Sequence, residues 1–589
     1  MVVPKIMGSE TEFGVKVDEK ICFRPAYFII NTLFTQNDVV LGDFCRPDWV
    51  GIEKDILMAR EGGISQDSEF NWKLYGLYGF NGGRIYPENI WLPESSTPEC
   101  SDARELVNYE KAGEWILEGA KQLSQNIIGS RINLYKNNYG FSGNMKGSQR
   151  QESYGCHMNF LVGRRFFSLL TMESKFAEAN IMQDLLISYK LAMIICTGSG
   201  RVGFMSGREV CDYQISQRAD FMRRLFAYDT TSNRPIINTR DNPYADSEKY
   251  GRLHDIFFDS NMSETSIFLK AGITALVLEA LEDSYNLYRI PIPIKNPIKT
   301  LYKISRDLSL EEELIEFENG RRMRALDLLK NHWLPLLKDY VVYRKKNDPV
   351  TTELIERWED VLKKLDRNPD LTFGILDWTT KKRLIKEYLY KNGGKAKALS
   401  LRRALLEMVR QGCLSSFTNR EELLRQFSDP EKIVKLLNFW ETEFKDWLKC
   451  VDIQYHDTNR KTGLYYILEK SGKMERITSN NEIENAIFSP PKGTRAYFRQ
   501  KFIKKFGADS VGWNIIKLRE KSSGRSLSLE NLDPVFLNEE NSDLLVDGCD
   551  NIEEFLNIIR ASGGDEKGMV LSEFNPLKFR LRAINEEED

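Results

Sequence analysis

The feature that most constrains the fold is a short N-terminal segment, IMGSETEFGV at residues 6–15, in which two glutamates alternate with small residues. This pattern predicts a β-strand within residues 3–17. Successive side chains of a strand point to opposite faces, so Glu10 and Glu12 share one face. Two like charges on one face repel unless a cation lies between them, and Mg²⁺ prefers carboxylate and phosphate oxygens. A metal site and a solvent-facing pair of glutamates are both consistent with this strand alone.

A second acidic group surrounds another predicted strand, at residues 82–88. Glu88, Glu94 and Glu99 lie in the stretch NGGRIYPENIWLPESSTPEC, which begins at residue 81. Three more carboxylates beside a strand favour the metal interpretation, because a hard cation needs several oxygen ligands.

The composition excludes other classes of protein. The 589 residues are 41% hydrophobic and 29% charged, with a formal net charge of -3, which is unlike a disordered or nucleic-acid-binding chain. The nine cysteines form no CxxC pair, which argues against a disulfide framework and a structural zinc site. The N-terminus lacks the apolar core of a signal peptide, and the longest apolar stretch, 185–196, is too short to span a bilayer. We therefore expect a cytoplasmic enzyme without a membrane or nucleic-acid partner.

The order of predicted elements indicates an α+β fold, with a mixed or antiparallel sheet early in the chain and helices packed on it. Helical spacing predicts helices over the ranges 101–127, 165–197, 263–286 and 310–335. We expect a large catalytic domain over 1–440, a small C-terminal domain over 441–575, and a disordered acidic tail over 576–589.

Cationic residues gather later in the chain, at Arg201, Arg218, Arg240 and His254. A guanidinium offers a planar fork of donors that suits phosphate oxygens, so these residues are candidates for nucleotide binding. The segment GSGRVG at 198–203 is not a dinucleotide-binding fingerprint, and no GxxxxGK[ST] motif occurs, which excludes Rossmann and P-loop sites. A carboxylate-bound metal facing several arginines suits phosphoryl transfer.

At these residues the sequence resembles the Pup ligase and depupylase family (PafA and Dop), relatives of glutamine synthetase. The resemblance runs from residue 6 to about 507. It is carried by ordered blocks that include IMGSETEFGV, NGGRIY, PESSTPEC, SYGCHMNFLV, TGSGRVG, QISQRADF, RPIINTRDNPYADSEKYGRLH, SNMSETSIFLKAG, LDWTTKKRLI, DIQYHDTNRKTGLYY and PPKGTRAYFR.

The resemblance implies a glutamine-synthetase-like antiparallel sheet with a concave ATP site, helices packed behind it and a small C-terminal domain. It implies ATP (or ADP plus phosphate) and Mg²⁺ as cofactors, a Pup-like disordered modifier and pupylated proteins as partners, and a monomer. Glu10, Glu12, Glu94 and Glu99 would then surround the metal, while Arg201, Arg218, Arg240 and His254 would contact the nucleotide. The motifs TGSGRVG, QISQRADF and PPKGTRAYFR favour the depupylase/deamidase branch, with an ATP-dependent Pup–protein ligase as the alternative.

Two departures from the family pattern affect the chemistry. The family's catalytic Asp follows a strand Tyr, here Tyr86, and either Glu88 or Asn89 takes its place. Strand alternation puts Arg84, Tyr86 and Glu88 on one face, which favours Glu88. Between His157 and Asn159, two further active-site candidates, Met158 replaces the family's Glu. These changes leave a third hypothesis open, a divergent ATP-binding or phosphatase homologue that does not act on Pup.

Overall fold

A computed structural model gives the arrangement of most of the chain. It describes residues 2–17, 25–36, 77–78, 81–88, 92–143, 149–171, 177–203, 213–391, 445–520, 524, 526–531, 533–561 and 579–583. Asn89 and the segment 61–72, whose Gly, Ser and acidic residues predict a loop, lie outside the described residues.

The central element is a six-stranded sheet in which every described neighbour pair is antiparallel. Its order is β14 (Tyr250–Asp255), β9 (Cys156–Gly163), β1 (Met7–Glu12), β5 (Pro93–Ser96), β4 (Arg84–Pro87) and β3 (Leu77–Tyr78). Along β1, buried Met7, Ser9 and Thr11 alternate with partly exposed Gly8, Glu10 and Glu12. The predicted α+β class, the antiparallel sheet and the shared face of Glu10 and Glu12 are therefore confirmed.

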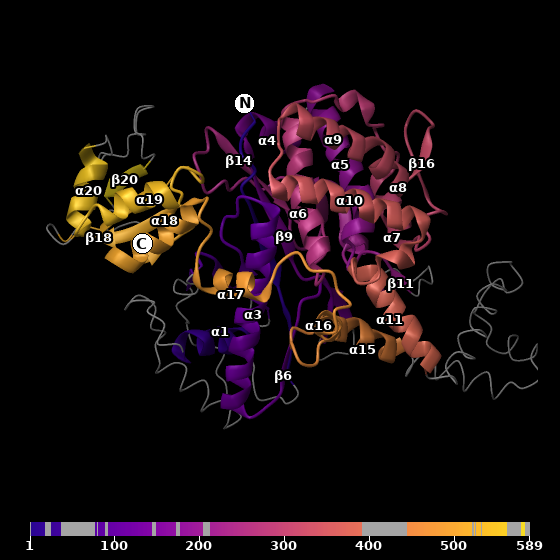
Figure 1. The fold of residues 1–589 in the computed structure, drawn as a ribbon, viewed down its shortest axis with the longest axis horizontal. Coiled ribbons are helices and arrows are strands. Elements are labelled where there is room, and N and C mark those ends of the chain that lie inside the picture. The colour runs from indigo at the N-terminus through magenta and orange to yellow at the C-terminus, as the bar shows by residue number, and fades with distance from the viewer. Residues whose placement is uncertain are drawn as a thin grey trace, which may run out of the picture.

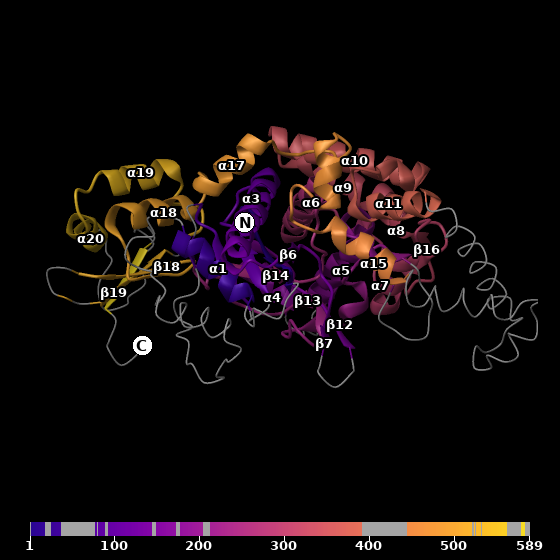
Figure 2. The same ribbon diagram turned by 90° about the horizontal axis from the view of Figure 1, so that it is seen from below.

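Four helices cover the buried face of this sheet. They are α3 (Ala103–Ile128), α4 (Arg164–Thr171), α5 (Ala177–Thr197) and α6 (Glu264–Glu282). Asp102 caps the N-terminus of α3, and Ser263 caps α6, so the first free N–H groups of both helices are satisfied. Figure 2 shows α3 and α6 on one side of β14.

Helix α5 is long and apolar enough to cross a membrane, but it is mostly buried inside the fold. Its Lys190 is fully buried and forms an ion pair of 2.9 Å with Asp255 of β14. The structure therefore uses α5 as the core helix between the sheet and the outer helices.

An outer helical layer follows, and it differs from expectation at its start. Residues 310–335, predicted as one helix, contain the hairpin β15 (Leu314–Glu316) and β16 (Arg322–Arg324), because Gly320 adopts a positive φ of 82° at the turn. The layer comprises α7 (Pro297–Arg306), α8 (Ala325–Leu328), α9 (Leu334–Tyr343), α10 (Pro349–Arg367) and α11 (Asp377–Lys391).

Smaller elements are α1 (Pro25–Gln36), β2 (Gly14–Val17), β6 (Ile132–Tyr135), β7 (Gly140–Gly143), β8 (Gln149–Glu152), β10 (Arg201–Val202), β11 (Tyr213–Gln214), β12 (Met222–Ala227) and β13 (Arg234–Asn238).

The division between the two domains falls later than residue 440. Helices α15 (Lys445–Tyr455), α16 (Leu464–Lys470) and α17 (Asn480–Phe488) pack on the large domain, where Tyr455, Tyr465 and Tyr466 share a core with Met262. A separate core begins at Phe498. Packing therefore separates the domains at about residue 490.

The C-terminal domain is a four-stranded antiparallel sheet covered by helices, and it lies beside the large domain (Figures 1 and 2). Its elements are α18 (Arg495–Phe506), β17 (Ser510–Val511), β18 (Ile515–Arg519), β19 (Ser526–Asn531), α19 (Glu539–Asp547), α20 (Ile552–Ala561) and β20 (Phe579–Ala583). The expected disordered tail is wrong at 579–583, because Phe579 and Leu581 are buried in the core and β20 pairs with β19.

Candidate active site

The register of the sheet gathers the polar side chains of four strands on its open face. Glu12 of β1 is paired with Glu94 of β5, which is paired with Tyr86 of β4. One row further along, Glu10 is paired with His157 of β9. Because residues paired across antiparallel strands have side chains on the same face, these groups form two adjacent rows.

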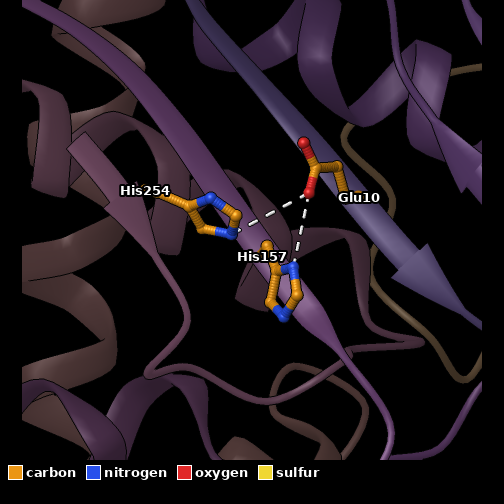
Figure 3. Close-up of side chains that lie close together, drawn as sticks. All are labelled: Glu10, His157 and His254. Atoms are coloured by element: carbon orange, nitrogen blue, oxygen red, sulfur yellow. Dashed lines mark hydrogen bonds and ion pairs between the residues drawn. The ribbon is translucent and has the colours of Figure 1, made fainter. Parts of the chain in front are cut away.

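Glu10 lies at the centre of a compact group of donors (Figure 3). Its Oε2 is 3.3 Å from Nδ1 of His157 and 3.9 Å from Nε2 of His254. Its Oε1 accepts a hydrogen bond of 3.0 Å from the amide of Asn159 and lies 3.6 Å from Arg252. Burial alone would raise the pKa of Glu10, but His157, His254 and Arg252 outweigh burial and lower it. Glu10 is therefore held as a carboxylate.

His254 lies in this group, and its ring stacks at a tilt against His157 with centroids 4.8 Å apart. Burial lowers the pKa of His254 to about 3, despite the nearby Glu10 carboxylate, so the imidazole is neutral at physiological pH. One ligand atom each from Glu10, His157 and His254 lie within 4.8 Å of one another. The structure thus places His254 with a carboxylate, where the sequence led us to expect a phosphate contact.

The other carboxylates crowd together on the β4–β5 side. Glu94 is 3% exposed, and its pKa is raised well above the usual value by burial and then by the charges of Glu10, Glu12 and Glu88. Glu12 Oε2 accepts a hydrogen bond of 2.7 Å from the backbone N–H of Gly155. Such a concentration of acidic oxygens fits a cation, because a positive ion removes the repulsion that raises the pKa of Glu94.

Glu88 directly follows β4, and its backbone N–H donates to the carbonyl of Leu92 at 3.0 Å. Its pKa is raised by partial desolvation of the carboxyl and by the charge of Glu12, while the interaction with Glu94 lowers it. The Glu88 carboxyl therefore reaches the acidic row, as strand alternation from Tyr86 predicts. The guanidinium of Arg84 lies 4.7 Å from the centroid of the Tyr86 ring, and the Tyr86 hydroxyl is 3.3 Å from Ser96 Oγ.

Met158 is fully buried, because it points to the opposite face of β9 from His157 and Asn159. Its side chain therefore contacts the core and not the Glu10 group. The substitution at position 158 removes no carboxylate from the open face.

Glu99 is not part of the acidic row. Its two oxygens bind Arg495 at 2.9 Å and Arg499 at 2.7 Å, both from helix α18 of the C-terminal domain. Burial alone would raise the pKa of Glu99, but Arg499 and Arg495 together lower it to about 2. The expectation that Glu99 binds a metal is corrected, because its charge is already neutralised by two arginines.

Arg201 and Arg218 also have a different place from the one expected. Arg201 is 1% exposed, and its guanidinium lies over the rings of Tyr139 and Phe221, at 4.7 and 5.4 Å from their centroids. Arg218 is fully buried and donates to Ser153 Oγ at 3.2 Å and to the carbonyl of Ile256 at 2.8 Å. Both guanidiniums stabilise the fold from within, so neither is exposed to a nucleotide.

Sequence reasoning missed Arg252, which orients the Glu10 group. Its Nη1 donates to the Asn159 oxygen at 2.7 Å, and its Nε donates to the carbonyl of Asn242 at 2.7 Å. The signal was present in the segment GRLH, because Arg252 is two residues before His254 on the same strand and so shares its face.

A pocket of about 90 Å³ borders the Glu10 group on the side of the C-terminal domain. The large domain contributes Gly8, Glu10, Tyr244 and Arg252, and the C-terminal domain contributes Arg495 and Trp513. The pocket combines aromatic surface with two cationic groups, and Glu10 and Glu99 also line it. The two domains therefore build one site.

An antiparallel sheet whose open face carries rows of carboxylates beside a pocket with aromatic and cationic lining is typical of an enzyme that binds a cation and a charged substrate. Comparison with known proteins identifies the family. A profile of the Pup-ligase protein family matches residues 5–435 and 420–517. The chain belongs to the Pup ligase family.

The curated relatives include both branches of that family. The chain is 31% identical over 480 residues to the Pup deamidase/depupylase of Mycolicibacterium smegmatis, covering 81% of this chain and 82% of the relative. It is 32% identical over 478 residues to the Pup–protein ligase of Nocardioides sp., covering 80% of this chain and 89% of the relative.

Two solved structures share the fold. One is the complex of the prokaryotic ubiquitin-like protein Pup with its ligase PafA, with a TM-score of 0.64, 26% identity and 92% of each chain covered. The other is the Pup ligase PafA in complex with ADP, with a TM-score of 0.61, 26% identity, and 87% of this chain and 96% of that chain covered.

Proposed function

We propose that the chain is a nucleotide- and Mg²⁺-dependent depupylase/deamidase. It would cleave the isopeptide bond between a Pup-type modifier and a protein lysine, or the C-terminal amide of the modifier. Family membership supports a reaction on Pup, and the relatives include an enzyme of this activity. The single observation that carries the proposal is the Glu88 carboxyl at the end of β4, beside the row formed by Glu12 and Glu94.

The residues present fit a magnesium ion. Mg²⁺ prefers oxygen ligands, and Glu12, Glu94 and Glu10 supply carboxylates on one face of the sheet. His157 and Asn159 would orient Glu10 through the contacts already described. When bound, the ion would neutralise phosphate charge and the carboxylates around it.

We further propose that the pocket beside Trp513 holds the base of the nucleotide. An aromatic face suits a nucleobase, and the cationic Arg252 and Arg495 line the same pocket. Arg240, the remaining sequence-based candidate for phosphate contact, does not line this pocket. A nucleotide placed here would direct its phosphates toward the acidic rows, where the metal would bind.

Glu88 would act on the reacting carbonyl as base or nucleophile. As a base, its carboxylate accepts a proton from water while the water oxygen attacks the carbonyl carbon, and the lysine amine leaves with a proton. Its raised pKa suits this role, because a general base works best when its pKa is nearer to the operating pH.

The alternative is an ATP-dependent Pup–protein ligase, which the likeness to PafA over 92% of the chain favours. In that reaction the modifier's γ-carboxylate takes the γ-phosphoryl group of ATP, and a lysine amine then displaces phosphate from the acyl phosphate. Glu88 would accept the proton of the attacking amine. The same carboxylate rows would serve both reactions.

The test uses the full chain with ATP and Mg²⁺ in two reactions. A purified Pup conjugate tests cleavage, and Pup ending in Glu together with a lysine-bearing protein tests ligation. We expect cleavage of the conjugate, its loss in Glu88→Ala, and unchanged cleavage in the control Glu105→Gln, whose carboxylate binds Ser101 at the start of α3. Ligation without cleavage would favour the alternative, and nucleotide binding without either product would support a divergent homologue. If Asn89→Ala and not Glu88→Ala abolishes turnover, the assignment of Glu88 is wrong.

A further inference from the structure

Arg218, four residues before β12, is a buried cation without a counter-ion. Its side chain is fully buried, and among the described residues no carboxylate lies within ion-pair distance of its guanidinium. Burial lowers the pKa of Arg218 despite the charges of Asp259 and Glu12 nearby. Burying an unpaired charge is costly, so we expect this guanidinium to have a role that a neutral side chain could not fill.

The guanidinium joins the ends of two strands of the central sheet. Its Nη1 donates to the carbonyl of Tyr154, two residues before β9, and its Nη2 donates to the carbonyl of Ile256, directly after β14, at 2.8 Å. Nη1 also donates to Ser153 Oγ at 3.2 Å. These two strands carry the histidines, the asparagine and the arginine that surround Glu10. One planar fork of donors therefore ties both strand ends to the same point.

The peptide group between Tyr154 and Gly155 connects Arg218 to Glu12. Its carbonyl accepts the bond from Arg218, and its N–H donates to Glu12 Oε2 at 2.7 Å. A peptide group is planar, so a bond that holds the carbonyl also fixes the direction of the N–H. The approach is close, because a Cβ added at Gly155 would lie 2.6 Å from Glu12 Oε1. The Glu12 carboxylate is therefore linked to Arg218 through one rigid group.

The backbone of Arg218 is anchored in turn by Asp259, which is also buried. Asp259 Oδ1 accepts hydrogen bonds from the N–H of Arg218 at 3.0 Å and from the hydroxyl of Ser216 at 2.9 Å. Its Oδ2 accepts from the N–H groups of Gln217 and Ser199, both at 2.8 Å. With its backbone fixed in this way, the guanidinium is preorganised and loses little conformational freedom when it binds the two carbonyls.

We propose that Arg218 is a positioning residue for the Mg²⁺ site: it holds the peptide group of Tyr154 and Gly155 so that the Gly155 N–H orients the Glu12 carboxylate. The role of Glu12 as a metal ligand rests on the proposed function. Groups that orient a metal ligand from behind typically contribute about 10- to 100-fold to metal affinity. The charge of Arg218 alone acts in the opposite direction, because a cation near the site repels Mg²⁺. Positioning and charge therefore predict opposite effects of a neutral replacement.

The test compares Arg218→Gln with the matched control Arg201→Gln in the full chain. Arg201 is also buried, at 1% exposure, but its guanidinium lies over the rings of Tyr139 and Phe221. Arg218→Lys is the second variant, because it keeps the charge but lacks the fork that bridges two carbonyls. Denaturant unfolding identifies the variants that fold, and titration calorimetry measures their affinity for Mg²⁺. Hydrogen exchange of the Gly155 amide, followed by mass spectrometry of the metal-free chain, measures the positioning itself.

We expect Arg218→Gln and Arg218→Lys to weaken Mg²⁺ binding about tenfold or more and to speed exchange of the Gly155 N–H. Arg201→Gln should leave both unchanged. The proposal would be overturned if Arg218→Gln bound Mg²⁺ as tightly as the unaltered chain or more tightly, as the removal of a repelling charge alone predicts. It would also be overturned if Arg201→Gln weakened Mg²⁺ binding equally, or if the Gly155 N–H exchanged at the unaltered rate in the Arg218 variants. The proposed function fails separately, when the unaltered chain binds Mg²⁺ but cleaves no Pup conjugate.

Discussion

Replacing Glu99 by glutamine removes the charge that joins the C-terminal domain to the end of β5. Glu99 Oε1 is 2.9 Å from Arg495 Nε, and Oε2 is 2.7 Å from Arg499 Nη2. The two arginines lower the pKa of Glu99 from 4.5 to about 2. Because one pKa unit corresponds to about 1.4 kcal/mol, this difference is equivalent to about 3 kcal/mol of stability. This value agrees with the cost of about 3–5 kcal/mol that is typical for breaking a buried ion pair.

The stabilisation by Glu99 also depends on pH. A carboxyl whose folded pKa is lowered contributes above its unfolded pKa, and the contribution is lost as the pH falls from about 4.5 toward 2. The free energy of unfolding should therefore be about 3 kcal/mol lower in Glu99→Gln at neutral pH, with a difference that shrinks toward about pH 3. Denaturant unfolding, followed by tryptophan fluorescence at several pH values, measures this difference in unfolding free energy.

The control is Asp543→Asn, which removes an exposed ion pair with Lys501 in the same domain and should cost only about 0–1 kcal/mol. Magnesium affinity should be unchanged in Glu99→Gln. The ion-pair assignment would be refuted if the unfolding free energy of Glu99→Gln equalled that of the unaltered chain. It would also be refuted if the variant lost Mg²⁺ binding with its stability intact, and Glu99 would then be assigned as a metal ligand.

Two further predictions concern the metal and the nucleotide. Glu94→Gln removes a buried charge that Glu10, Glu12 and Glu88 repel, so the metal-free chain should melt at a higher temperature, while the increase in melting temperature on adding Mg²⁺ should shrink. Scanning calorimetry with and without Mg²⁺ checks both parts, and an unchanged response to Mg²⁺ would contradict the ligand role. Trp513→Ala should weaken ADP binding about tenfold, since stacking of an aromatic ring on a base contributes about 1–3 kcal/mol. Titration calorimetry with ADP measures this loss, and an unchanged affinity would exclude Trp513 from the nucleotide pocket.

The part of the site that could be predicted from sequence is local. Strand alternation is a two-residue rule, so the shared face of Glu10 and Glu12 and the direction of Glu88 after Tyr86 follow from spacing alone. The pairing of Glu12 with Glu94 is a matter of register between strands about 80 residues apart. The acidic residues around the two predicted strands suggested that Glu12 and Glu94 lie close together, but only the strand pairing in the sheet determines that they are neighbours.

The errors come from residues whose partners are distant in the chain. Glu99 is neutralised by Arg495 and Arg499, which are 396 and 400 residues away, so its sequence neighbours give no sign of the pairing. Arg201 and Arg218 also have partners that are distant in the chain. A guanidinium suits a phosphate by its chemistry, but both of these are buried among carbonyls and aromatic rings of separate segments.

Glu99 joins the two domains at the pocket that both of them line. Cores that pack separately, one ending near residue 490 and the other starting at Phe498, describe two folding units. Yet Arg495 both binds Glu99 and lines the pocket that contains Glu10 and Trp513. The ion pair that attaches the C-terminal domain therefore also holds Arg495 in the wall of the pocket. Any change that loosens this attachment should weaken nucleotide binding before it affects the carboxylate rows, because those rows depend on the register of β1, β4, β5 and β9 in the large domain.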